Sequence, residues 1–242
     1  IAINNNVATF DNIFGTSPTI AKADLSSIVL EGFTTVGFYA FYELFNNLSS
    51  VDISGNTIKN ISNLAFYNCK KLKTLKISNS VESIGDYSFY GCSDLQSVTI
   101  PDSVTSMGDG AFRECTKLNE LKISNSVTTI GTNVFRQCSK LQSVKIPDLV
   151  TSIGTAAFAD CVDLSSVTFG VSCEDISGQA FNNCTSLTKL IVSRKLNNIG
   201  EKAFMNCNEL GTILVPDLSN ITQGVDNFKS ISSNPSIYIY KP

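Results

Sequence analysis

The chain has 242 residues, of which 43% are hydrophobic and only 16% are charged, and this apolar content excludes an intrinsically disordered protein. The net charge is −3 and no block of Lys and Arg stands out, so the sequence lacks the basic patch of a nucleic-acid-binding protein. It contains no run of about 18 apolar residues, so we expect no membrane insertion.

The chain contains no histidine. This absence removes Ser-His-Asp and Cys-His catalytic arrangements and every metal site that depends on His. The acidic residues lie mostly in expected turns, as at Asp94, Asp102, Asp109, Asp148 and Glu174, and they form no inward-facing cluster. We therefore expect a protein that is not an enzyme, with no cofactor and no metal ion.

The beginning of the chain differs from the rest. It opens at Ile1 without Met and without the basic and apolar segments of a signal peptide, so we expect a mature fragment whose targeting signal is missing. Residues 1–24 fit no repeat unit. They predict an N-terminal cap, because a solenoid needs a cover at the open end of its core.

Residues 25–228 form an array of units 23 residues long. Three columns of identical residues keep this spacing in step, which predicts a stack of similar coils around one continuous core. The columns are Phe66, Phe89, Phe112, Phe135, Phe158, Phe181 and Phe204; Cys69, Cys92, Cys115, Cys138, Cys161, Cys184 and Cys207; and Leu72, Leu95, Leu118, Leu141, Leu164, Leu187 and Leu210.

Each unit predicts a strand, a turn and a short helix. In one unit, the alternation around Leu75 and Ile77 indicates a short strand, and Gly85 marks a turn. The Ala-Phe-x-x-Cys-x-x-Leu stretch places its apolar residues three apart, which suits one or two helical turns. The sequence therefore predicts an α/β solenoid with a parallel, concave β-sheet.

Ten strands are expected in this sheet, and the last of them lies in residues 229–242, which we expect to close the array within one structural domain. The predicted strands are Ile28–Leu30, Val51–Ile53, Leu75–Ile77, Val98–Ile100, Leu121–Ile123, Val144–Ile146, Val167–Phe169, Leu190–Val192, Ile213–Val215 and Ile237–Ile239.

The consensus A-F-x-x-C-x-x-L-x-x-L-x-I-P-x-x-V-x-x-I-G resembles the BspA-like leucine-rich-repeat family. Ala111-Phe112, Cys115 and Leu118 carry it, together with Ile100-Pro101. The resemblance implies a leucine-rich-repeat horseshoe, and a surface or secreted protein of host-associated bacteria or anaerobic protists that adheres to host extracellular proteins or other cells. It implies no catalytic residues. The chain departs from the pattern at residues 43–44 and at residues 170–173, where Gly-Val-Ser-Cys replaces the Pro-Asp turn.

The eight cysteines allow three interpretations. Neighbouring members of the Cys column would lie about 5 Å apart, within the range of a disulfide, but their side chains would point in parallel. The chain has no C-x-x-C motif and no His to complete a zinc site. Buried free thiols are the favoured interpretation, with disulfides and a metal site as alternatives. Cys173 occupies a Val position and is expected to be a small buried hydrophobe.

Side chains that alternate with the inward residues are expected on the concave surface. Lys76, Lys122 and Lys145 follow one column and suit an acidic protein or polysaccharide, the alternative being a face that only confers solubility. Further along, Ile191, Leu214 and Tyr238 continue that column as an expected apolar patch, with Tyr240 beside them. The patch suits a ligand or self-association site. The alternatives are a contact with a missing C-terminal domain and burial by the terminal segment itself as a cap. The candidate ligand-binding residues are Thr74, Lys76, Glu120, Lys122, Lys145, Lys189, Ile191, Leu214, Tyr238 and Tyr240.

Three functions are compatible with these features. The favoured one is a non-catalytic binding or adhesion scaffold that presents its concave sheet to a host extracellular matrix protein, another cell-surface protein or a polysaccharide. The alternative is a structural spacer that carries other domains. An enzyme is disfavoured, because it would need a pocket with converging carboxylates. We expect an extracellular or cell-surface location, and neither nucleic acid nor membrane as a partner.

Overall fold

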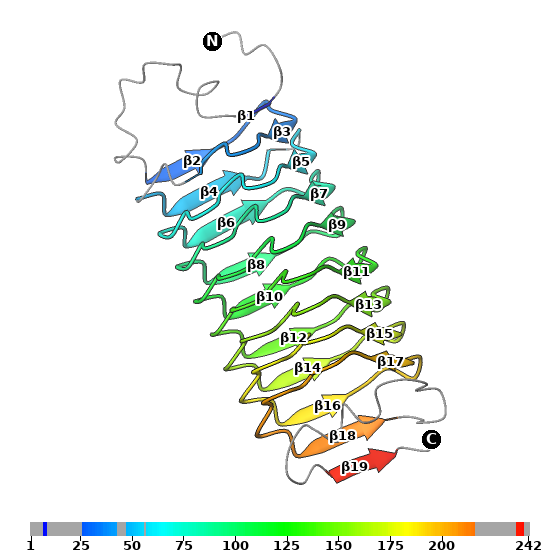
Figure 1. Ribbon diagram of the computed structural model, residues 1–242. Coiled ribbons are helices and arrows are strands. Elements are labelled where there is room, and N and C mark those ends of the chain that lie inside the picture. Colours follow the sequence, from blue (N-terminus) through cyan, green and yellow to red (C-terminus); the bar gives the residue numbers. More distant parts are fainter. Residues whose placement is uncertain (1–6, 9–25, 43–46, 56, 216–235, 240–242) are drawn as a thin grey trace.

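The computed structural model describes residues 7–8, 26–42, 47–55, 57–215 and 236–239. These residues form an elongated stack of coils in which every strand is parallel to the equivalent strand of the next coil (Figure 1). None of the described residues forms a helix that could span a membrane.

The first side of the stack, which we call the long-strand face, holds the ten predicted strands. Alternate residues point inward, as at Val144, Val167 and Leu190, which occupy paired positions. The observed strands are β2 (Ser27–Val29), β4 (Ser50–Ile53), β6 (Thr74–Ile77), β8 (Ser97–Thr99), β10 (Glu120–Lys122), β12 (Ser143–Lys145), β14 (Ser166–Thr168), β16 (Lys189–Ile191), β18 (Thr212–Val215) and β19 (Ser236–Ile239). The prediction of a parallel solenoid is confirmed.

A second row of strands, each two residues long, forms another side of the stack, and from β3 to β17 each of them follows one long strand in the chain (Figure 1). These strands are β1 (Val7–Ala8), β3 (Thr35–Val36), β5 (Asn60–Ile61), β7 (Ser83–Ile84), β9 (Ser106–Met107), β11 (Thr129–Ile130), β13 (Ser152–Ile153), β15 (Asp175–Ile176) and β17 (Asn198–Ile199). Of the predicted cap at residues 1–24, only β1 is among the described residues, and it pairs with β3. At the other end β19 pairs with β18.

The long-strand face is divided into three hydrogen-bonded sheets rather than one. Its breaks lie between β6 and β8 and between β10 and β12. In the β4–β6 pair, the Ser78 N–H donates to the carbonyl oxygen of Ile53 at 3.1 Å just after the strand. The equivalent residues after β8 and β12 are Pro101 and Pro147, which have no N–H to donate. The sequence motif Ile-Pro thus coincides with both breaks.

The predicted short helices are wrong, since the described residues contain no helix and the solenoid is built from strands and turns. In one coil, the N–H groups of Ser88 and Cys92 donate three residues back along the chain, to Gly85 and Phe89. Alternate N–H groups donate instead to the next coil, as from Phe89 to the carbonyl oxygen of Ala111 at 2.8 Å. Tyr87 has φ 51°, a left-handed conformation that an α-helix cannot include.

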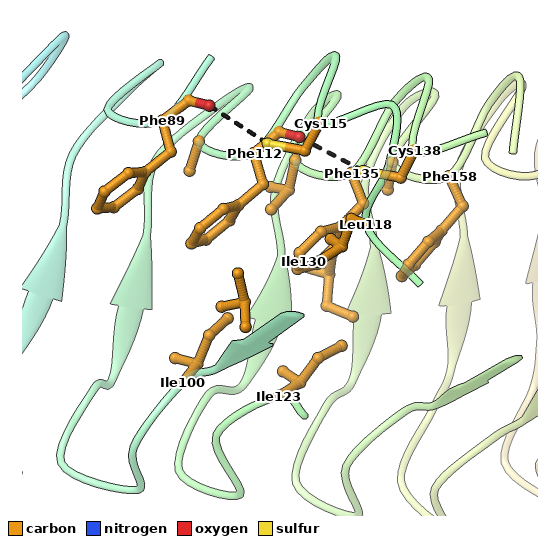
Figure 2. Close-up of a cluster of buried hydrophobic side chains, with 14 of the residues drawn as sticks. Phe89, Ile100, Phe112, Cys115, Leu118, Ile123, Ile130, Phe135, Cys138 and Phe158 are labelled. Carbon is orange, nitrogen blue, oxygen red and sulfur yellow. Dashed lines mark hydrogen bonds between the residues drawn. The ribbon is translucent and has the colours of Figure 1, made fainter. Parts of the chain in front are cut away.

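The core runs through the described coils as columns of equivalent residues, part of which Figure 2 shows. Phe rings from Phe41 to Phe204 stack in parallel, with ring centroids 4.9–5.7 Å apart and interplanar angles of 1–18°. These side chains are fully buried. The Phe column expected from the 23-residue period is therefore the centre of the core.

Candidate binding surface

Most of the proposed ligand-binding residues are exposed on the long-strand face. Each lies next to an inward-pointing residue in its strand, because successive side chains of a strand point to opposite sides. The exposed members are Thr74, Lys76, Glu120, Lys122, Lys145, Lys189 and Ile191, and Leu214 is half-buried. Tyr238 lies in β19 but its side chain is not described, and Tyr240 lies outside the described residues.

Lys76 differs from the other lysines of this face because a carboxylate neutralises it. Its Nζ lies 3.1 Å from Oδ2 of Asp52, the paired residue of the preceding strand. Hydrogen bonds from Ser54 and the charge of Lys76 together hold the pKa of Asp52 below its usual value. The expected stripe of three uncompensated lysines is thus reduced to Lys122 and Lys145.

Shallow hollows open at the two breaks between the sheets. The first, of 690 Å³, lies between β6 and β8 and is lined by Lys76, Pro101 and Lys122. The second, of 210 Å³, lies between β10 and β12 and is lined by Lys122, Lys145 and Pro147. Lys122 therefore lines both hollows.

Asp102 lines the first hollow and is held in place by the next coil. The backbone N–H of Asn125 donates to Asp102 Oδ1 at 2.9 Å, and its side-chain amide contacts both carboxylate oxygens. These hydrogen bonds, with a smaller contribution from the charge of Lys122, lower the pKa of Asp102. The Asp102 carboxylate is thus ionised, and its hydrogen bonds to Asn125 join the turns of two neighbouring coils.

An apolar hollow of 560 Å³ lies further along the same face. Its exposed apolar side chains are Val171 and Ile191, which are 67% and 45% exposed, with Phe169 and Leu214 beside them. Ile191 pairs with Leu214, and Leu214 pairs with Tyr238. The three residues therefore occupy equivalent positions in neighbouring strands, as expected.

Of the residues that line this hollow, only Ile191 and Leu214 were among the predicted site residues; the exposed ones that were missed are Val171, Arg194 and Lys195. The signal for Val171 was present, because it stands in the Gly-Val-Ser-Cys segment that replaces the Pro-Asp turn of other units. Arg194 and Lys195 follow Ser193, whose buried hydroxyl accepts a hydrogen bond from the N–H of Lys195 at 3.1 Å. This turn holds the two basic residues at the edge of the hollow.

The repeat pattern matches a family model described as "BspA type Leucine rich repeat region", in six copies over residues 34–164 and 128–240. The chain belongs to the BspA-type leucine-rich-repeat family. No curated protein matches it.

Solved structures of similar proteins come from bacteria. The leucine-rich-repeat protein TpLRR of Treponema pallidum is 26% identical, with a TM-score of 0.62, over 87% of this chain and 92% of its own. A leucine-rich-repeat protein of Eubacterium ventriosum is 18% identical, with a TM-score of 0.50, over 90% of this chain and 60% of its own. These likenesses support the leucine-rich-repeat fold of this BspA-type chain.

The Cys column of this BspA-type repeat consists of buried free thiols. Each thiol donates to the carbonyl oxygen of a Phe residue in the preceding coil, as from Cys115 to Phe89 at 3.3 Å (Figure 2). Burial raises the pKa of Cys161 to about 12, and that of Cys115 well above its usual value. In the described part of the chain no three Cys, Asp or Glu side chains gather where a metal ion would be held.

Proposed function

We propose that this protein is a non-catalytic binding scaffold that holds an extracellular partner against its long-strand face. The observation that carries the proposal is the apolar hollow around Val171 and Ile191. Exposed apolar side chains that adjoin one another on a folded protein mark interaction surfaces more often than isolated ones do. A stack of coils with a continuous core is a rigid support for such a surface.

The lysines of this face and the form of its hollows favour a partner larger than a small molecule. Lys122 and Lys145 lie on the same face as the hollow, two or more coils away from Ile191. The hollows are only partly enclosed by protein, whereas small-molecule sites enclose most of the ligand. A macromolecule spanning several coils would contact both the basic and the apolar part.

We further propose that the chain acts outside the cell, at a surface or after secretion. Membership of the BspA-type family supports this location. Eight free cysteines do not argue against it, because all eight are buried and burial raises the pKa of their thiols, which disfavours the reactive thiolate.

A solid-phase assay on decellularised mammalian extracellular matrix tests the proposal. The variant Val171→Ser/Ile191→Ser should bind at least about 10-fold more weakly than the native chain, a loss of about 1.4 kcal/mol. Both side chains are exposed, so the variant should keep the native melting temperature within a few degrees.

The matched control is Phe38→Ser/Val162→Ser, which removes two side chains that are 57% and 37% exposed away from the long-strand face. It should bind like the native chain. Equal binding by both variants would contradict the proposal. Absence of matrix binding by the native chain would favour the second candidate, a structural spacer, which the elongated stack of coils also suits (Figure 1).

A further inference from the structure

The three hollows of the long-strand face lie along one line. Each is formed where long strands end and the following turn begins, at equivalent positions of successive units. Ile77, Ile100, Ile123, Phe169 and Val192 mark that position in the linings. Because these residues stand at or just after the carboxyl ends of the long strands, the line runs from coil to coil along the stack.

Gly170 joins the basic and apolar parts of this line. A Cβ atom on Gly170 would lie 2.3 Å from the carbonyl oxygen of Pro147, so the two backbones are in direct contact. Pro147 lines the hollow beside Lys145, and Gly170 lines the hollow beside Ile191. The two hollows thus adjoin where Gly170 packs on Pro147, and we call the two together the turn groove.

Charge along the turn groove is unbalanced. Among the described residues, Lys59, Lys117 and Lys140 of other surfaces each pair with a carboxylate of a neighbouring coil. No carboxylate of the described residues lies within 4.0 Å of the groove's own cations, which are Lys122, Lys145, Arg194 and Lys195. The carboxylate of Asp148 stands beside the groove, and its Oδ1 accepts a hydrogen bond from the N–H of Val171 at 3.4 Å, so the four cations outnumber it.

We infer that the turn groove binds an extended polypeptide segment whose carboxylates face Lys122 and Lys145 and whose large apolar side chain enters the hollow around Val171 and Ile191. The inference rests on the proposed function and names the partner class for the same face. An anionic polysaccharide would satisfy the lysines but would leave the apolar hollow facing water. A segment carrying both kinds of side chain satisfies both parts.

The spacing of the coils sets the spacing within the segment. Lys145 lies two strands from Ile191, which corresponds to about 10 Å at the usual strand separation of about 4.8 Å. Lys122 lies one strand further, across the break between β10 and β12, at about 14 Å or more. An extended chain advances about 3.3 Å per residue. The carboxylates should therefore lie about three to five residues from the apolar anchor.

Selection of random 12-residue peptides displayed on phage against the immobilised full chain tests this inference. We expect enriched peptides that carry Asp or Glu about three to five residues from Leu, Ile, Phe or Trp. Peptides selected on the immobilised variant Lys122→Glu/Lys145→Glu should lack the acidic residues and carry Lys or Arg at the same spacing. Peptides selected on the immobilised variant Val171→Ser/Ile191→Ser should lack the apolar anchor and keep the acidic residues.

Affinities of one enriched peptide, measured by fluorescence anisotropy, complete the test. Lys122→Glu/Lys145→Glu should weaken binding at least about 10-fold, whereas Lys70→Glu/Lys71→Glu, which makes the same change of charge elsewhere, should weaken it less than about twofold. Changing the peptide's acidic residues to Lys should restore binding to the first variant and abolish binding to the native chain.

Two results would overturn the inference: no enrichment of the acidic-plus-apolar pattern, or heparin binding that depends on the two lysines but not on Val171 and Ile191. The peptide selection could fail while Val171→Ser/Ile191→Ser still loses matrix binding. That result would reject the extended acidic segment as the partner but would leave the proposed function standing. If the matrix assay also shows no effect of that variant, both proposals are rejected.

Discussion

At the scale of single residues, identity at one repeat position is enforced by contact with the same residue in the neighbouring coils. Phe135 is fully buried between Phe112 and Phe158, with centroid distances of 5.7 and 5.3 Å. Its ring is nearly parallel to both neighbours. A smaller residue would leave a void on both sides of its own coil, because the flanking coils are held by backbone hydrogen bonds and cannot close the gap.

Phe135→Ala should lower the free energy of unfolding by about 3–5 kcal/mol. Phe135→Leu should lower it less, because most of the side-chain volume remains. Urea denaturation followed by circular dichroism measures both. A loss below about 1 kcal/mol for Phe135→Ala would contradict the central place of the Phe column.

The buried thiols predict a dependence of stability on alkaline pH. The folded pKa of Cys161 is about 12, against an ordinary value of 9.0, so the unfolded chain releases this proton first. The contribution of the thiol is therefore fully present below about pH 9 and is lost as the pH rises toward 12, at up to about 1.4 kcal/mol per pH unit. Cys161→Ala should show a shallower decline of unfolding free energy between pH 8 and 10.5 than the native chain. Parallel declines in the two proteins would contradict burial of this thiol.

At the scale of elements, a chain of turns replaces the helix because neighbouring coils supply the hydrogen-bond acceptors. Two residues in each turn segment have positive φ, four positions apart in the same coil. Seven of these fourteen positions hold Asn, Asp or Gly, the residues that tolerate this conformation best. The fourteen are Leu64, Asn68, Tyr87, Gly91, Gly110, Glu114, Asn133, Gln137, Ala156, Asp160, Gln179, Asn183, Lys202 and Asn206.

Gln179→Gly should stabilise the protein by up to about 1 kcal/mol. Gln179 is exposed with φ 59°, and glycine relieves the strain that a Cβ atom causes there. Glu209→Gly, at an exposed position without positive φ, should destabilise the protein by about 0.5–1 kcal/mol. Thermal melts of the two variants give the comparison, and a loss of stability in both would contradict the left-handed turn.

Gly170 tests the contact between neighbouring turns. Gly170→Ala should cost about 1–3 kcal/mol, because its Cβ atom would lie 2.3 Å from the Pro147 carbonyl oxygen. Gly211→Ala is the control, since the nearest atom there would lie 3.9 Å away, and it should change stability by less than about 0.5 kcal/mol. Similar unfolding midpoints in urea for the two variants would exclude the close approach.

At the scale of the whole molecule, each coil contacts only the coils on either side of it, so length can change without a change of fold. Leu118 and Leu141 occupy the same repeat position, and both are fully buried. The register of the stack is therefore kept whenever whole units are removed.

Deletion of residues 118–140 should leave a cooperatively folded, shorter solenoid, because Phe112 would then stack on Phe158. Deletion of residues 118–129, about half a unit, should abolish cooperative unfolding, because it shifts every later inward side chain out of the core. Circular dichroism and urea melts of the two deletions measure this. Similar melts for both would contradict a core built on a 23-residue register.

The sequence alone determined the family, the parallel solenoid, the ten long strands and the buried columns, because the 23-residue period brings identical residues together in any stacked arrangement. It placed the outward residues from Thr74 to Ile191 through the alternation of side chains along a strand. The tertiary structure decided what depends on contacts between coils. Phe–Cys–Leu spacing fits both a helix and a chain of turns, and only the hydrogen bonds to the next coil select the turns. The ion pair between Asp52 and Lys76, the hollows at the sheet breaks and the contact of Gly170 with Pro147 likewise join residues more than 20 positions apart. Such interactions depend on distances in space, which the periodicity of the chain does not specify.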